Sequence, residues 1–180
     1  MKNSIIPLAL VVLLSACGGK QEEKSEATNA QELDGATLLQ DEGPVYDKTA
    51  INPDAPVVTI TVKAVGNSMA EMKYDQSALE VAAGSTVKLT LISETKEESM
   101  PHNWVLVKKG SAERVATKAI EAGPDKNYIP ATDDVLVATS LLKPGAKEEI
   151  TFPAPAAGEY LFICTYPGHW QQMQGTFTVK

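Results

Sequence analysis

The stretch EYLFICTYPGHWQQMQGTFTVK, residues 159–180, places a short loop between two segments with the composition of β-strands. EYLFIC is a short apolar run and GTFTVK alternates apolar with polar residues, and both patterns favour strands. The loop CTYPGHWQQM joins them, and its Pro167–Gly168 pair predicts a turn. Because this turn sends the chain back on itself, we expect Cys164 and His169 to face the same point.

Five further segments upstream have the same strand character. They cover residues 58–63, 86–93, 103–109, 135–139 and 148–152. Many short strands separated by Gly, Pro, Asn and Asp are typical of an all-β Greek-key sandwich or barrel. One segment differs, because SAERVATKAIEAG, residues 111–123, is rich in helix formers and ends at Gly123–Pro124. We expect this segment to be one helix inserted between strands and lying outside the sheets.

The N-terminus has the pattern of an export signal. A short start with Lys2 precedes an apolar run from Ile5 to Leu14, which is shorter than the roughly 20 residues of a spanning helix. The run ends in Leu-Ser-Ala-Cys, which resembles the bacterial lipobox. We therefore predict a lipoprotein signal peptide at residues 1–16 and a lipid on Cys17 that anchors the chain to a membrane. A plain secretory signal with an incidental cysteine is the alternative, and Gly18 in place of aspartate favours the outer membrane.

The character of the chain changes near Pro56. Residues 17–56 carry the lipidated cysteine and a polar, acidic segment with no sustained apolar period, which is typical of a flexible tether. Residues 57–180 contain all the predicted strands. We therefore expect one folded domain on a tether, with no second domain and no internal repeat.

The charge and the cysteine count exclude two classes of protein. The formal net charge is −7, whereas nucleic-acid binding needs clustered Lys and Arg, so we expect no nucleic-acid partner. The two cysteines cannot supply a disulfide framework, so the core must be held by packing.

The loop also carries the residues of a metal site. Cysteine, histidine and methionine offer the donors that suit copper, and a blue-copper site has two histidines, one cysteine and a weak axial methionine. The loop supplies Cys164, His169 and Met173, and the chain's other histidine, His102, precedes an apolar strand. Taken singly, a cysteine or methionine more often fills a core and a loop histidine more often lies on the surface. Together these residues use both histidines and the one cysteine that the predicted lipid does not occupy. An unpaired thiol exported to an oxidising compartment is a liability unless something holds it, which favours a copper site.

Three stretches resemble the azurins and the membrane-anchored auracyanins. They are NSMAEMKYDQSALEV, MPHNWVLV and CTYPGHWQQMQGTFTVK, and the resemblance covers residues 57–180. It implies an eight-stranded cupredoxin sandwich that holds one type 1 copper through His102, Cys164, His169 and Met173. It also implies a backbone carbonyl opposite the methionine, here from Pro101, where azurins carry glycine. Proline fixes φ at about −65° and so could displace this carbonyl, and the sequence leaves both outcomes open.

The resemblance assigns roles to the neighbours of these ligands. Asn103 is expected to join the two ligand loops near Thr165, and backbone N–H groups around Tyr166 are expected to donate to the cysteine sulfur. Trp104 is expected to be a core anchor rather than an electron relay. A docking patch for redox partners is expected around His169, with Trp170 turned inward as the alternative. Its members are Met100, Pro101, Pro167, Gly168 and Trp170.

These features together predict a one-electron carrier that is not an enzyme. The expected partners are c-type cytochromes, a terminal oxidase or a reductase. The chain is expected to be a monomer that is anchored in the bacterial envelope and faces the periplasm. The alternative is an envelope copper-binding protein for copper delivery or resistance. A copper oxidase or nitrite reductase would need further histidines, and a dinuclear copper centre would need two cysteines in the loop.

Overall fold

The computed structural model describes residues 50–180. The predicted signal peptide, the lipidation site Cys17 and most of the predicted tether lie outside the described residues. Within residues 50–180, no helix is long and apolar enough to span a membrane.

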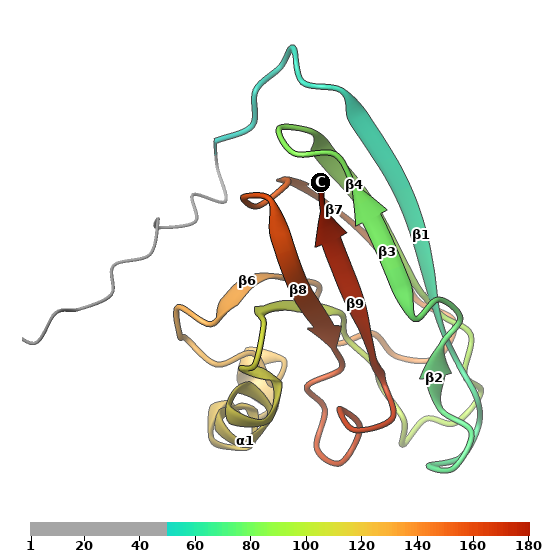
Figure 1. Ribbon diagram of the computed structural model, residues 1–180. Coiled ribbons are helices and arrows are strands. Elements are labelled where there is room, and N and C mark those ends of the chain that lie inside the picture. The colour runs from blue at the N-terminus through green and yellow to red at the C-terminus, as the bar shows by residue number, and fades with distance from the viewer. Residues whose placement is uncertain (1–49) are drawn as a thin grey trace, which may run out of the picture. The chain divides into compact units, whose positions relative to one another are not determined.

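The strands form two sheets that pack face to face (Figure 1). One sheet has the order β2-β1-β4-β7, from Lys73–Tyr74, Val57–Val65, Thr86–Ser93 and Lys147–Pro153. The other has the order β3-β9-β8-β5-β6, from Ala78–Val81, Gln174–Val179, Gly158–Ile163, Val105–Lys108 and Val135–Ala138. The predicted all-β sandwich is therefore confirmed. The two sheets do not close into a barrel. Residues 50–180 contain nine strands, against the eight expected, when the two-residue β2 is counted.

Alternation of side chains explains why these segments are strands. In β4, Val87, Leu89 and Leu91 are fully buried while the residues between them are only partly buried. β4 pairs in parallel with β1 and antiparallel with β7, so it lies in the middle of its sheet. The side chains that face inward from both sheets form one core, and a group of aromatic rings fills its centre. These rings belong to Trp104, Phe152, Phe162 and Phe177.

The predicted helix lies outside the sheets. It is α1, Ala112–Ala122, and it ends at Gly123, whose positive φ of 71° suits glycine. Val115 of α1 packs with Val105 and Val107 of β5 in a second, smaller apolar cluster. A short 3₁₀ helix, η1, Pro124–Lys126, follows and returns the chain toward β6.

Candidate metal centre

Two adjacent strands hold both ends of the loop 164–173. Cys164 follows β8 directly and Met173 precedes β9, and the two strands are paired up to their ends. The backbone N–H of Cys164 donates to the carbonyl of Met173 at 3.0 Å. Within the loop, the N–H of Met173 donates to the carbonyl of His169 at 2.9 Å, and that of His169 to the carbonyl of Tyr166 at 3.0 Å. The loop is therefore a closed turn with fixed ends.

His102 reaches the same place from a neighbouring strand. It lies just before β5, which pairs with β8. Its backbone is held by a pair of hydrogen bonds to Leu142, of 3.0 Å and 2.8 Å. Residues 62 positions apart in the sequence thus become neighbours.

The side chains of these residues converge. The ligand atoms of His102, Cys164 and His169 all lie within 4.8 Å of one another. The Nδ1 atom of His169 is 3.7 Å from the cysteine Sγ, and the Nδ1 atom of His102 is 4.0 Å from it. Metal bonds of about 2.0 Å to nitrogen and about 2.3 Å to sulfur, as in zinc sites, would separate the two atoms by about 3.7 Å at a trigonal angle. One metal ion therefore fits between them.

Burial sets the protonation of this group. The exposed fractions of His102, Cys164, His169 and Met173 are 0%, 0%, 1% and 0%. Burial lowers the pKa of both imidazoles to about 4, and the neighbouring His169 adds to this effect on His102. Both rings are therefore neutral at pH 7 and can donate a lone pair. Burial raises the pKa of the Cys164 thiol to about 11, so a metal ion must displace its proton on binding.

The sequence comparisons agree with this donor set. The family described as copper binding proteins, plastocyanin/azurin family, matches residues 60–180. The chain belongs to the plastocyanin/azurin family of copper-binding proteins. It is 43% identical to auracyanin-A of Chloroflexus aurantiacus over 64% of this chain and 72% of that protein. It is 34% identical to an azurin of Pseudomonas fluorescens biotype C over 66% of this chain and 98% of that protein.

Solved structures support the same assignment. The chain is similar to the dithionite-reduced auracyanin of Roseiflexus castenholzii, with a TM-score of 0.63 and 37% identity over 70% of this chain and 99% of that one. It is also similar to auracyanin A, a blue copper protein of Chloroflexus aurantiacus, with a TM-score of 0.61 and 38% identity over 69% and 99% of the two chains. As a cupredoxin, the chain takes one copper ion. Its histidines, cysteine and loop methionine are arranged like a type 1 copper site.

Asn103 joins the two halves of this cupredoxin site. Its side-chain amide donates to the Thr165 hydroxyl at 2.8 Å, and its side-chain oxygen accepts the Thr165 N–H at 2.8 Å. The same amide also donates to the carbonyl of Asn127 at 2.9 Å. The backbone N–H groups of Asn103 and Tyr166 hydrogen-bond the cysteine sulfur, and both lower the pKa of the Cys164 thiol against the larger effect of burial. These bonds stabilise negative charge on the sulfur.

Two further residues brace the site, and the sequence did not identify either of them. Tyr74, in β2, is buried and donates its hydroxyl to the Asn103 carbonyl at 2.5 Å. Asn127 has a left-handed backbone with φ of 54°, and its side-chain oxygen accepts the N–H of Leu141 at 3.1 Å. The stretch NSMAEMKY contains Tyr74, but nothing in its pattern indicates that its hydroxyl reaches a residue 29 positions away.

Replacement of Tyr74 by phenylalanine should destabilise the protein. The Asn103 carbonyl would then stay buried without its donor, and such a loss reduces the free energy of unfolding by about 1–3 kcal/mol. Urea unfolding of the copper-free protein measures the loss. Tyr160→Phe is the matched control, because the Tyr160 hydroxyl donates to the Ala156 carbonyl in an exposed setting, and its removal should change stability by no more than about 0.5 kcal/mol. Equal losses for the two variants would contradict the role given to Tyr74.

The residues expected around His169 differ in exposure. Gly168 is exposed, and Pro101, Pro167 and Trp170 are half-buried. The expectation for Met100 is wrong, because this side chain is only 6% exposed and packs in the main core.

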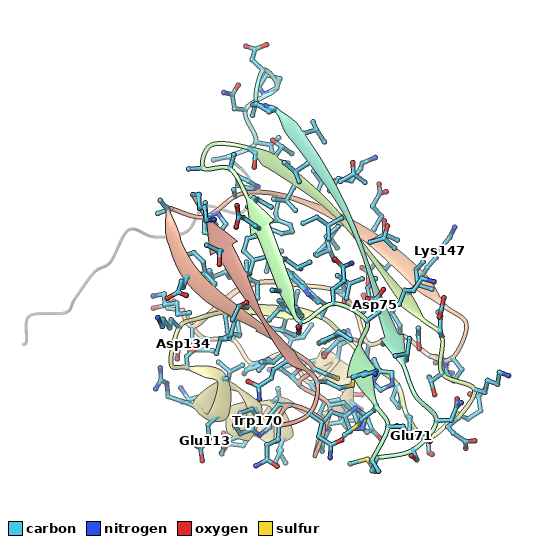
Figure 2. The ribbon with its side chains drawn as sticks, turned by 45° about the vertical axis from the view of Figure 1, so that its right-hand side comes forward. Glu71, Asp75, Glu113, Asp134, Lys147 and Trp170 are labelled. Atoms are coloured by element: carbon cyan, nitrogen blue, oxygen red, sulfur yellow. The ribbon has the colours of Figure 1, made fainter. Side chains whose placement is uncertain are left out.

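Trp170 is turned partly inward. It packs against the smaller apolar cluster beside α1, and Figure 2 shows it at the same end of the domain as Glu113 of that helix. A methionine that the sequence did not single out, Met69, is 50% exposed. Its terminal methyl group is 3.4 Å from the position that a Cβ atom on Gly168 would take. The apolar surface next to the loop therefore includes Met69 in place of Met100.

Proposed function

We propose that the chain is a one-electron carrier whose copper is held by His102, Cys164 and His169, with Met173 as the axial ligand. The observation that supports this proposal is the convergence of three donor atoms within 4.8 Å at fully buried positions. Copper, when bound, supplies a one-electron Cu(II)/Cu(I) couple. The chain's own part is to hold one geometry for both oxidation states.

The bracing of the donors suits rapid electron transfer. Two strands fix the ends of the loop, and Asn103 links the loop to the segment that carries His102. A frame with few degrees of freedom changes little when the charge of the metal changes, so little reorganisation opposes the electron. The near-complete burial of the donors also leaves no exposed position for a substrate, which favours a carrier over an enzyme.

The position where β1 begins suits a membrane anchor at the end of the domain opposite the copper loop. The loop 164–173 and the start of β1 lie at opposite ends of the sandwich (Figure 1). A tether would therefore join the domain at the end opposite the copper loop. We propose that residues 1–16 are a lipoprotein signal peptide, that Cys17 carries a lipid and that residues 17–56 tether the domain in the bacterial envelope on its periplasmic side. Partners would then be c-type cytochromes, a terminal oxidase or a reductase, and the outer membrane is the favoured location.

Electron exchange and copper transfer can be measured on the same sample. Copper-loaded protein is mixed with reduced c-type cytochrome in one experiment and with a copper chelator in another. A carrier should oxidise the cytochrome rapidly and keep its copper over the same period, because the donors are buried. The alternative, a protein for copper delivery or resistance, would lose copper to the chelator without a fast reaction with the cytochrome. That outcome would reject the proposed function.

Replacement of Met173 by leucine should raise the reduction potential and keep the blue colour. The axial thioether tunes the potential, and leucine has a similar volume but no donor atom. Loss of this donor disfavours Cu(II) and should raise the potential by on the order of 60 mV, which is a tenfold change in a one-electron equilibrium. Voltammetry measures the shift. Met72→Leu is the control, because Met72 is 2% exposed but lies outside the ligand loop, and an equal shift there would contradict the axial role.

A further inference from the structure

Copper must cross a surface to reach its ligands. All four donor side chains are at most 1% exposed. Of the residues beside His169 in the loop, Gly168 is exposed and has no side chain to cover the ring that follows it. The loop therefore exposes its backbone at Gly168, directly before the donor residue His169.

An exposed methionine side chain lies against this surface. Met69 is 50% exposed, and its methyl group comes within 3.4 Å of the Cβ position of Gly168. Among residues 50–180, every other sulfur-containing side chain is buried. These are Met72 at 2%, Met100 at 6%, Cys164 at 0% and Met173 at 0% exposed. The one exposed methionine among residues 50–180 is thus at the copper loop.

The loop that carries Met69 is fixed in place. The carbonyl of Ser68 accepts the N–H groups of both Glu71 and Met72 at 3.0 Å, which closes a turn around Met69. The side chain of Asn67 accepts the N–H of Lys96 at 2.8 Å. A Cβ atom on Gly66 would be 2.5 Å from the carbonyl oxygen of Glu71, so the turn packs tightly against its own start. Both loops lie at one end of the sandwich (Figure 1), and the label of Glu71 in Figure 2 marks that end.

The chemistry of a thioether suits one oxidation state of copper. Methionine sulfur is a soft donor that selects Cu(I), whereas Cu(II) favours nitrogen and oxygen donors. A thioether has no proton to lose and no charge, so a single one binds weakly and releases its metal readily. These properties are those of a transient ligand rather than of a resident one.

We propose that Met69 is the uptake ligand for Cu(I), which accepts the ion at the surface and passes it to His169 and Cys164. This proposal rests on the ligand set proposed above. The transfer is an exchange of ligands without a change of oxidation state, and the thiol proton of Cys164 leaves to solvent when the Cu–S bond forms. A purely apolar docking role for Met69 is the competing explanation, and it needs only the shape of the side chain.

The test compares Met69→Leu with the unaltered chain in the uptake of both oxidation states. Copper-free protein is mixed anaerobically with a coloured Cu(I)–bicinchoninate chelate, and the loss of the chelate's colour gives the rate of transfer. Uptake of aqueous Cu(II) is followed by the growth of blue colour. Met69→Leu should slow Cu(I) transfer by roughly tenfold, the effect of losing about 1.4 kcal/mol of stabilisation at the rate-limiting step. Its Cu(II) uptake rate, final spectrum and copper affinity should not change.

A second variant keeps the number of exposed thioethers constant. Ile120 of α1 is 61% exposed, and Ile120→Met combined with Met69→Leu places a thioether on the outer helix instead. This double variant should be as slow with Cu(I) as Met69→Leu alone. The proposal is overturned if Met69→Leu takes up Cu(I) at the unaltered rate, if it slows Cu(I) and Cu(II) equally, or if the double variant recovers the rate. Failure of the proposed function would look different, because the unaltered copper-loaded chain itself would then lose copper to the chelator without a fast reaction with the cytochrome.

Discussion

Replacement of Cys164 by serine is expected to abolish the blue colour and most of the copper affinity. The intense visible absorption of a type 1 site comes from charge transfer between Cu(II) and a thiolate, and a hydroxyl group cannot replace that thiolate. Serine also keeps its proton at neutral pH, so the metal would lose the one negatively charged donor among the four proposed ligands. Absorption and EPR spectra of the copper-loaded full chain measure the first effect, and competition with a chelator measures the second.

The fold should survive this substitution. Serine is close to cysteine in size, and the N–H groups of Asn103 and Tyr166 that now bond the sulfur can bond a hydroxyl oxygen. The bonds between Asn103 and Thr165 do not involve the cysteine side chain. Circular dichroism and thermal unfolding of the copper-free variant should therefore resemble those of the unaltered chain. Loss of colour without loss of fold assigns the effect to the donor atom.

The chain supplies its own matched control. Cys17→Ser exchanges the same atoms outside residues 50–180, and the variant should stay fully blue. It should also lose its attachment to membranes, if the predicted lipid is carried there. A Cys164→Ser protein with undiminished blue colour would contradict the ligand assignment and with it the proposed electron carrier.

Local patterns predicted the longer strands well. TVKLTLIS corresponds to β4 residue for residue, since its alternation reflects one buried face. Two short strands, β2 and β3, were missed, because KY is too short to establish a period and ALEV lacks the continuous apolar run that made β5 and β6, of the same four-residue length as β3, recognisable. β3 is held by parallel pairing with β9, about 100 positions later in the chain, and nothing local specifies such a partner.

The metal donors could also be predicted from the sequence, for a chemical reason. Cysteine and histidine are so scarce here that both histidines and the only cysteine of the domain had to be explained together. Their supporting residues were harder to find. Tyr74 reaches Asn103 through a hydrogen bond between distant segments, and Met100 is buried because the core closes over it rather than because of its neighbours in sequence. Contacts of this kind exist only after the sheets have packed.

Replacement of Trp104 by alanine is expected to cause the largest loss of stability. Its ring is fully buried and lies 5.7 Å from the ring of Phe162, 6.1 Å from that of Phe152 and 6.2 Å from that of Phe177, measured between centroids. Removal of so large a side chain leaves a cavity between the sheets, and such changes lower the free energy of unfolding by about 3–5 kcal/mol. Urea unfolding of the copper-free protein measures this loss.

Two control variants separate the ring's volume from its polar group and from its position. The indole N–H of Trp104 has no hydrogen-bond partner within the described residues, so Trp104→Phe should lose only part of this free energy, because it removes no hydrogen bond and leaves a smaller cavity. Trp170→Ala removes the other tryptophan, which is half-buried beside α1, and should cost less than Trp104→Ala. Equal losses at the two positions would contradict the central packing role of Trp104.

The copper site should remain intact in any Trp104→Ala protein that is still folded. Trp104 follows Asn103 directly, but its contribution near the site is its backbone N–H, which donates to the Thr139 hydroxyl at 2.9 Å and is unaffected by the side chain. None of the bonds that orient Cys164 or Asn103 comes from the indole ring. The folded variant should therefore keep its blue spectrum while it unfolds at a lower urea concentration. A folded Trp104→Ala protein that had lost its colour would show instead that the aromatic core positions the ligands as well as the sheets.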